Sequence, residues 1–397
     1  MTLLNNTWTL LLLCFLAGLG LSAGQDIHQM QYHLEKLTSV RHPFGADPNA
    51  REAARSYIKE QFQQYGLEVA VHTFSTTVWH QGQQRTVAGE NVIGVSEGAG
   101  GGPLLLVGAD YDTALNRHPL EDNGAGVGAM LEVARNYMAA TGPDGVFTRN
   151  STVIFVAFDL NTLEYDGSTG EPGAYHFVHQ WLWPHLNQSL LKFAGAIILD
   201  SISKINMDQN SQYLPQDFGK AFPSAYKRIS EDGNKGDFLA LVTRGTSQSK
   251  RLKDTFTGNY LKHRKAGLIR LQELVVHTNS PVSIPTLEMI NHQAHYHFWT
   301  FQPSDQLTAL PALLLTDTDF YRKSSEECPL PCSAEAFLTR QRKQSLALTC
   351  SGVLYTLLDM QAERRRPGET GEVTSGASVG VTLAMTWLLA AVAAILH

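Results

Sequence analysis

Short apolar runs recur along this chain, and helical patterns separate several of them. The clearest helical pattern spans residues 124–139, where Val127, Met130, Leu131 and Ala134 form one apolar stripe at spacings of three and four residues. Strands buried on both faces read as continuous apolar runs. The alternation therefore predicts an α/β domain with a mostly parallel central sheet and helices on both faces. The predicted strands are residues 91–95, 104–107, 153–158, 194–199 and 312–315.

The segments outside these strands differ in how clearly their sequence predicts secondary structure. Residues 26–74 predict a helix, a loop, a helix and a strand, with Pro48 suited to a first helical turn and Gly66 to a helix end. Residues 201–300 show no clear periodicity. We expect that segment to contain insertions over the site.

Both ends of the chain carry apolar segments that resemble processing signals. An apolar run at 10–21 precedes Ser22-Ala23-Gly24, which predicts a signal peptide over 1–24 and an ectodomain over 25–360. A polar stalk at 361–378 leads to an apolar tail at 379–397 without charged residues. We predict a GPI-attachment signal with Ser375 as the attachment residue, and the alternative is a single transmembrane helix. Either reading predicts the secretory pathway and the cell surface.

Charge argues against one class of partner. The formal net charge is −6, and the longest basic run, residues 364–366, lies in the predicted stalk. Nucleic acid is therefore not an expected partner. The sequons at Asn150 and Asn187 predict glycosylation of an extracellular domain.

The cysteine count predicts one disulfide and one free thiol. Cys14 belongs to the predicted signal peptide, which leaves Cys328, Cys332 and Cys350. The first two could pair locally, or either of them could pair with Cys350.

Acidic residues follow two of the predicted strands and open the long helix. They lie in "GADYDT", in "LEDNGAG" and at the end of "AGAIILD". Together with "ENVIG", "VIFVAF" and "PALLLTDTDFY", these stretches resemble the zinc-dependent exopeptidases of the aminopeptidase, glutamate-carboxypeptidase and transferrin-receptor group. The resemblance runs from about Leu34 to Asp319 and implies a phosphorylase/hydrolase-like α/β fold.

The resemblance implies a site with two zinc ions, five ligands and one general base. Two ligand positions are kept, as the bridging Asp122 and as Asp200. The first ligand is a histidine in the family and Asp110 here. Asp112 is kept, at the position of the residue that in the family hydrogen-bonds to that first ligand without touching the metal. Zinc accepts both imidazole and carboxylate ligands.

Three other positions of the family's site have changed. The general base is Asn161, whose amide cannot take up a proton at neutral pH, and the adjoining glutamate ligand is Thr162. The last ligand, a histidine expected soon after "DTDFY", is missing, because no histidine lies between His297 and His397. We therefore predict an inactive homologue with no catalytic residues and no zinc.

Several alternatives concern the metal. Asp110, Asp122 and Asp200 could form an all-oxygen pocket for calcium or magnesium. Asp122 could instead cap the following helix while the other two are polar strand ends.

A rebuilt zinc site would need other ligands. Glu164 is one candidate, although the Gly167-Ser168 closure argues against a shifted register. The cluster of His292, His295 and His297 is another, with the last two on one face if the chain is extended. A G-x-S-x-G elbow for a serine nucleophile is absent from the sequence.

The leading hypothesis is a GPI-anchored pseudoenzyme that binds a protein or peptide at the cell surface. The first alternative is an active metallopeptidase with a rebuilt metal site. The second is an adhesion or co-receptor ectodomain that binds through a surface patch.

Overall fold

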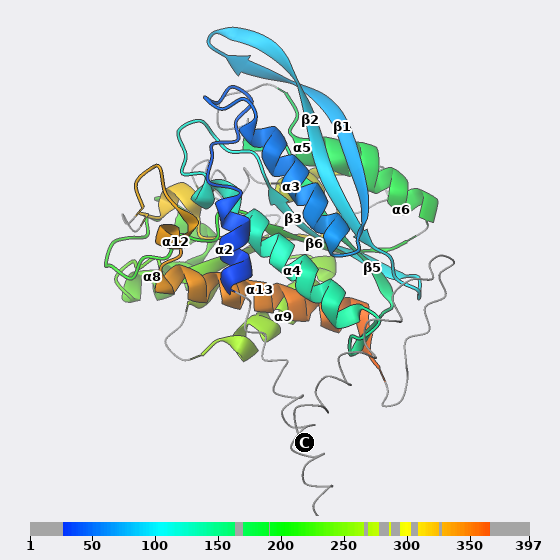
Figure 1. Ribbon diagram of the computed structural model, residues 1–397. Helices are drawn as coiled ribbons and strands as arrows, with labels where there is room; N and C mark the ends of the chain where they lie inside the picture. The colour runs from blue at the N-terminus through cyan, green and yellow to red at the C-terminus, as the bar shows by residue number, and fades with distance from the viewer. Residues whose placement is uncertain are drawn as a thin grey trace, which may run out of the picture.

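An eight-stranded sheet forms the centre of the computed structural model, in the strand order β1-β2-β5-β3-β6-β9-β7-β8 (Figure 1). The structure describes residues 27–162, 170–189, 191–265, 269–277, 286, 294–302, 309–324 and 328–365. The predicted signal peptide, apolar tail and Ser375 lie outside the described residues, as do Glu164, Gly167, Ser168 and His292. Within the described part of the chain, no helix is both long and apolar enough to cross a membrane.

The middle of the sheet is parallel and has an antiparallel neighbour on each side, and the edge strand β8 runs parallel to β7. Strands β5, β3, β6 and β9 run parallel to one another, whereas β1 and β2 form an antiparallel hairpin beside β5, and β7 runs antiparallel to β9. The α/β prediction is confirmed, with a mixed sheet. The strands are β1 (Glu68–His80), β2 (Gln83–Ser96), β3 (Gly102–Asp110), β4 (Phe147–Arg149), β5 (Ser151–Phe158), β6 (Phe193–Leu199), β7 (Phe238–Arg244), β8 (Arg270–Val276), β9 (Ala312–Thr316) and β10 (Ala362–Arg364).

Helices cover both faces of the sheet because the central strands are apolar on both faces. Leu105 and Val107 of β3 join one hydrophobic core, and Leu104 and Leu106 join the other. The first core also takes side chains from α2 (Ile27–Glu35), α3 (Ala50–Gln64), α4 (Ala125–Thr141), α9 (Ser247–His263), α12 (Ala334–Phe337) and α13 (Arg340–Gln361). The second takes them from α5 (Gly173–His176), η3 (Phe177–Leu182), α6 (Trp183–Ser189), α7 (Phe218–Ala221), α8 (Pro223–Glu231) and α11 (His295–Thr300).

The long helix α4 lies where the apolar stripe predicted it. Val127, Met130, Leu131 and Ala134 are all fully buried. At Gly128 the helix passes so close to α2 that an added Cβ would lie 3.1 Å from the sulfur of Met30. The small residue therefore allows α2 to pack directly on α4.

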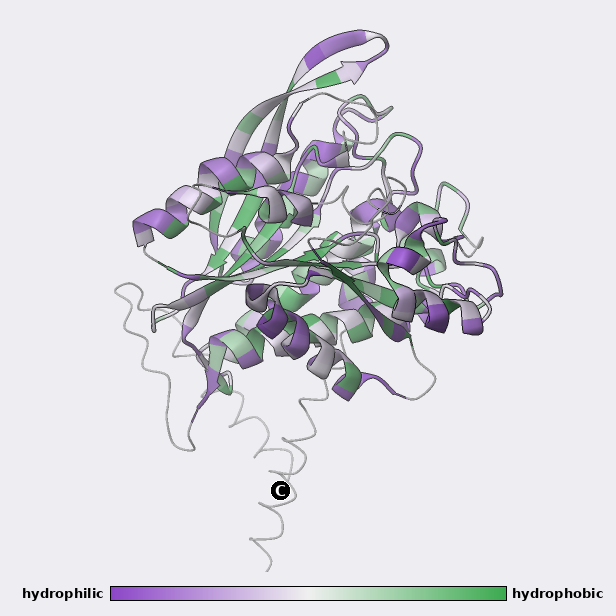
Figure 2. Ribbon diagram, turned by 180° about the vertical axis from the view of Figure 1, so that it is seen from behind, coloured by the Kyte–Doolittle hydropathy of each residue, from purple (hydrophilic) through white to green (hydrophobic). Residues whose placement is uncertain are grey.

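The hairpin of β1 and β2 projects beyond the rest of the molecule (Figure 1). Its far end is largely hydrophilic, whereas the central strands are hydrophobic (Figure 2). The preceding helix α3 ends at Gln64, and Gly66 follows with φ +79°, so the predicted glycine stop is correct.

The structure adds detail to the second half of the chain. Residues 201–300, in which we expect insertions over the site, also supply β7, β8 and α9 to the main fold. Charged residues on the edge strand β8 hide its strand pattern, because only one of its sides pairs. The fold also continues past residue 360, since β10 pairs with β4 and the Arg365 guanidinium donates to the carbonyls of Gly142 and Pro143.

Candidate functional site

The carboxyl ends of four parallel strands meet at one edge of the sheet, and the predicted site residues lie there. Asp110 ends β3, Asn161 and Thr162 follow β5, and Asp200 follows β6. All of these side chains are buried, with exposed fractions of 3–6%. The sheet thus brings together the positions that the sequence pattern singled out.

Neutral donors satisfy the carboxylates on one side of this edge, which we name the amide corner (Asp110, Asp112, Asn161 and Thr162). Asn161 Nδ2 donates to Asp110 Oδ1 at 2.8 Å, and Asn161 Oδ1 accepts from the Ala174 N–H at 3.0 Å. Asp112 accepts from the N–H groups of Asn161 and Thr162, each at 3.1 Å, and from the Thr162 hydroxyl at 2.5 Å. Both side chains at the family's glutamate positions therefore make internal hydrogen bonds.

The turn η1 (Leu120–Gly124) presents Asp122, and the prediction that Asp122 caps the next helix is wrong. Asp122 Oδ2 accepts from the Ala114 N–H at 3.1 Å, and α4 begins only at Ala125, without a side-chain cap on its Gly124 N-cap. Asn123 is the residue that ties this turn to the sheet. Its Nδ2 donates to the Leu199 carbonyl at 2.8 Å, and its Oδ1 accepts from the N–H groups of Ser201 and Gly126 at 3.0 and 3.2 Å.

On the other side of this edge, ion pairs satisfy Asp319 and backbone N–H groups satisfy Asp317; we name this side the lysine corner (Asp317, Asp319, Lys204 and Arg117). Lys204 Nζ lies 2.7 Å from Asp319 Oδ1, and Arg117 Nη2 lies 2.6 Å from Asp319 Oδ2. Asp317 accepts from the N–H groups of Lys204 and Asp319 at 2.7 and 2.8 Å. Sequence reasoning missed this corner, although the acidic residues after β9 carry the same strand-end signal as Asp110.

Electrostatics link the two corners. Burial, followed by the charges of Asp200 and Asp112, raises the pKa of Asp110 well above its usual range. Burial and the charges of Asp122 and Asp319 do the same for the pKa of Asp200. Burial and the Asp319 charge raise the pKa of Asp122 to about 7. The carboxyl groups therefore lie close enough to oppose one another's ionisation.

Arg41 hydrogen-bonds to backbone segments that carry site residues, and the sequence did not predict this role. Its guanidinium donates to the carbonyls of Leu37, Tyr111 and Pro119 at 2.5, 2.6 and 3.0 Å. Its side chain is fully buried, and the charges of Asp122 and Asp112 partly offset the lowering of its pKa to about 10 by burial. One cation therefore joins the strand end of Asp112 to the turn that carries Asp122.

The predicted histidine cluster has a different geometry from the one expected. His295 and His297 lie in the helix α11, so two residues of separation put them on different sides rather than on one face. His295 packs edge-on against Trp299, and His297 against Tyr175. Within the described residues, neither belongs to a cluster of potential metal ligands.

The structure resolves the cysteine alternatives and places both sequons on the surface. Cys328 and Cys332 form a disulfide, and Cys350 is free and buried. Asn187 is exposed on α6, whereas Asn150 is half-buried and donates to Glu363 at 3.1 Å. Asn187 is the more accessible of the two predicted acceptors.

Comparisons with known proteins agree with this architecture and place the chain among proteins with a zinc-exopeptidase fold. The structure is similar to an aminopeptidase from Aneurinibacillus sp. strain AM-1, with a TM-score of 0.54 at 11% identity over 89% of this chain and 97% of that one. It is also similar to BSAP, a zinc aminopeptidase from Bacillus subtilis, with a TM-score of 0.52 at 12% identity over 84% of this chain and 94% of that one.

Sequence comparison names the family more closely. Residues 91–241 match peptidase family M28. The chain is also 26% identical over 344 residues to the uncharacterized protein YfbL of Escherichia coli (strain K12), covering 83% of this chain and 87% of that protein. The predicted resemblance to the zinc-dependent exopeptidases is thus supported in sequence over residues 91–241, which match peptidase family M28, and in fold by the two aminopeptidase structures.

Proposed function

We propose that this protein no longer hydrolyses peptides and acts at the cell surface by binding a protein or peptide ligand. One observation carries the proposal. Asn161, at the position of the general base, is fixed between the Asp110 carboxylate and the Ala174 N–H. An amide in this setting cannot take a proton from an attacking water, a step that contributes about 10²–10⁴ in rate.

The donor set also fits a pair of zinc ions poorly. The family resemblance assigns a glutamate ligand to the position of Thr162, whose hydroxyl donates its proton to Asp112 instead of facing an ion. Asp110 accepts a hydrogen bond from Asn161, which uses one of its oxygens. Lys204 and Arg117 supply positive charge beside Asp319, and cations next to a metal site oppose metal binding.

Two alternatives retain a metal. Asp110, Asp122 and Asp200 offer only oxygen atoms, a set that suits calcium or magnesium better than zinc. An active metallopeptidase would need a replacement for the base. The surrounding hydrogen bonds of the amide corner give Asn161 and Thr162 a structural role, and this favours the binding function over either alternative.

Two parts of the molecule are candidates for the ligand site: the sheet edge that carries the aspartates, and the outer surface. The projecting β1–β2 hairpin and the exposed Asn187 sequon belong to the surface that an adhesion or co-receptor role would use. The predicted lipid anchor would hold that surface outside the plasma membrane.

One experiment tests the anchor, the metal and the activity in turn. Expressing cells are treated with phosphatidylinositol-specific phospholipase C, and the released protein is purified without chelators. We expect release into the medium, much less than one zinc per chain by elemental analysis, and no hydrolysis of aminoacyl reporters above buffer. Protein that stays in the membrane contradicts the lipid anchor.

A matched variant sharpens the result on activity. Asp122→Asn removes the bridging carboxylate, so it should leave the zinc content and the background hydrolysis of the natural protein unchanged. Stoichiometric zinc together with activity that Asp122→Asn abolishes would refute the pseudoenzyme proposal.

A further inference from the structure

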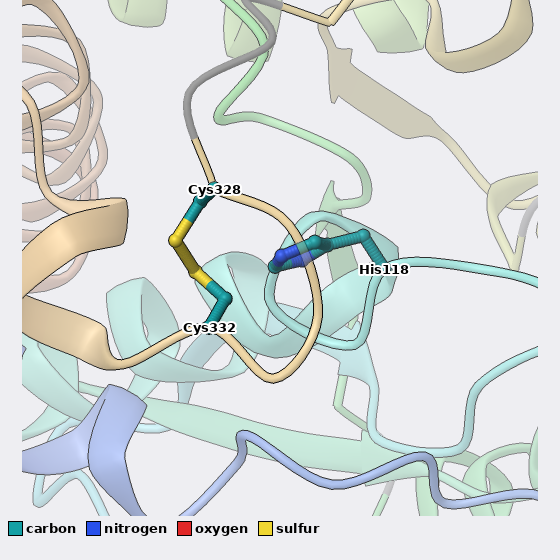
Figure 3. Close-up of side chains that lie close together, drawn as sticks. All are labelled: His118, Cys328 and Cys332. Atoms are coloured by element: carbon teal, nitrogen blue, oxygen red, sulfur yellow. A yellow bond between two sulfur atoms is a disulfide. The ribbon is translucent and has the colours of Figure 1, made fainter.

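We infer that His118, Cys328 and Cys332 form a binding site for a thiophilic divalent metal ion, such as zinc, when the disulfide between the cysteines is reduced. The potential ligand atoms of the three residues all lie within 4.8 Å of one another. Figure 3 shows the His118 ring directed toward the disulfide from a separate segment of the chain. This site is distinct from the aspartates at the sheet edge and uses different donor atoms.

The chemistry of the reduced form suits zinc. Reduction adds two electrons and two protons to the sulfur–sulfur bond and gives two thiols, with a thiol or phosphine reductant as the electron donor. Metal binding then releases one proton from each thiol, so that two thiolates and one imidazole face the ion. Two cysteines and one histidine form a known zinc ligand set that leaves a fourth position for water.

The surroundings hold the imidazole in place. The His118 ring stacks on Phe337 of α12, with centroids 5.6 Å apart and an interplanar angle of 18°. Its Nδ1 accepts from the Leu120 N–H at 3.3 Å, which is a long hydrogen bond. An ion bound at Nε2 would place the ring proton on Nδ1, so binding has to break this long hydrogen bond.

The local charge balance allows a cation. Burial lowers the pKa of His118, which favours the neutral imidazole that metals bind. Glu121 contributes a negative charge near the ring, and its partner Arg342, at 2.6 Å, contributes a positive one. Two thiolates would then make the site net negative before the ion enters.

The site connects to the aspartate cluster through the backbone. The His118 carbonyl accepts from the N–H groups of Glu121 and Asp122 at 3.0 and 2.9 Å. An ion bound by His118 would therefore be anchored at the start of the turn that presents Asp122. The inference does not depend on whether the protein hydrolyses peptides.

Cobalt(II) provides the test, because thiolate ligands give it a charge-transfer absorption that carboxylates do not. The full-length protein is reduced with a phosphine under native conditions, freed of reductant without air, and titrated with cobalt. We expect about one cobalt per reduced chain with the thiolate band, displacement by zinc, and no band from the oxidised protein.

Variants assign the ligands. Loss of a supporting residue around a metal ligand already weakens affinity about 10–100-fold, so His118→Gln, which removes a ligand, should weaken cobalt binding at least tenfold. Cys350→Ala and Asp200→Asn should keep the band and the affinity, because neither residue belongs to the site. His118→Gln leaves the disulfide intact, so it remains informative if the cysteine variants do not fold.

Three results would overturn the inference. The first is a reduced, folded protein without the thiolate band. The second is unchanged cobalt affinity in His118→Gln. The third is loss of the folded state on reduction, measured by circular dichroism, since the three ligands converge only in the fold.

Discussion

The amide corner and the lysine corner satisfy buried carboxylates in opposite ways. In the amide corner the donors are neutral: the Asn161 amide, the Thr162 hydroxyl and two backbone N–H groups. In the lysine corner two cations, Lys204 and Arg117, share the Asp319 carboxylate. Asp122 and Asp200 lie between these corners and feel the charge of Asp319.

The difference between the two sets of donors determines which carboxylates stay ionised in the site. Neutral donors compensate a buried charge only in part, so the pKa of Asp110 stays well above its usual range. In the lysine corner, burial lowers the pKa of Lys204, but the charges of Asp319 and Asp317 outweigh burial and the net shift is upward. Protonation therefore relieves Asp110 in the first corner, and ion pairing relieves Asp319 in the second, where burial still raises the pKa of the neighbouring Asp317 to about 6.

Removal of the lysine should have the largest effect on stability. Lys204→Met leaves the Asp319 carboxylate with Arg117 alone and removes a buried charge, for which about 3–5 kcal/mol of lost unfolding free energy is typical. Urea unfolding at pH 7.5 measures the loss. Lys227→Met is the matched control, because the Lys227–Glu231 pair is exposed and its loss should cost less than about 1 kcal/mol.

A second substitution checks that the loss comes from the ion pair. In the Lys204→Met background, Asp319→Asn removes the carboxylate that then has only Arg117 as a cationic partner, and this should restore part of the stability. Equal losses for Lys204→Met and Lys227→Met would show that the lysine corner does not need its cation.

The sequence predicted the parts of the fold and site that depend on local pattern. The strands that end at Asp110 and Asp200, and the helix after Asp122, all read directly from apolar periodicity. The lysine corner could not be read in this way, because Lys204 and Asp319 are far apart in sequence and meet only through the sheet order β6-β9. The choice among three cysteines likewise needed the fold, which pairs Cys328 with Cys332 and leaves Cys350 free and buried.

The helical state of His295 and His297 shows a different limit. A short apolar run with polar neighbours predicts helix and strand about equally well, and the two readings place these side chains on different faces. Packing against the second core favours the helix, whereas the predicted metal site required an extended chain.

Loss of the threonine hydroxyl should have a smaller effect in the amide corner. Thr162→Val keeps the shape of the side chain but removes the donor to Asp112, which is fully buried. Asp112 keeps its two backbone donors, and loss of one hydrogen bond to a charged group costs about 1.5–3 kcal/mol, so Thr162→Val should be less harmful than Lys204→Met. Thr162→Ser, which keeps the hydroxyl, serves as the control in the same urea unfolding series. A larger loss for Thr162→Val than for Lys204→Met would reverse the proposed ranking of the corners.

The smallest expected effect is a pH-dependent one at Asp122, between the corners. Its pKa in the fold is raised to about 7, above the value of roughly 4 expected for an unfolded chain, so the folded state binds more protons between those values. The Asp122 contribution to the unfolding free energy therefore falls as pH rises through this window. His33 has the opposite effect on the pH dependence of stability, because burial lowers the pKa of His33 to about 3. A variant is therefore needed to isolate the contribution of Asp122.

Comparison of Asp122→Asn with the natural protein at two pH values isolates this contribution. At pH 8 Asp122→Asn should be more stable by about 1 kcal/mol, because it removes a buried charge without a full partner, and the gap should close by pH 5. The gain stays small because the neighbouring carboxyl groups titrate together and share the proton uptake. A protein that binds a metal through Asp122 would give the opposite sign, since Asp122→Asn then removes a ligand and destabilises the fold at pH 8. Thermal unfolding with and without a chelator measures the difference in stability between Asp122→Asn and the natural protein. A more stable variant at pH 8 means that the Asp122 carboxylate binds no ion, and a less stable variant means that it is a metal ligand.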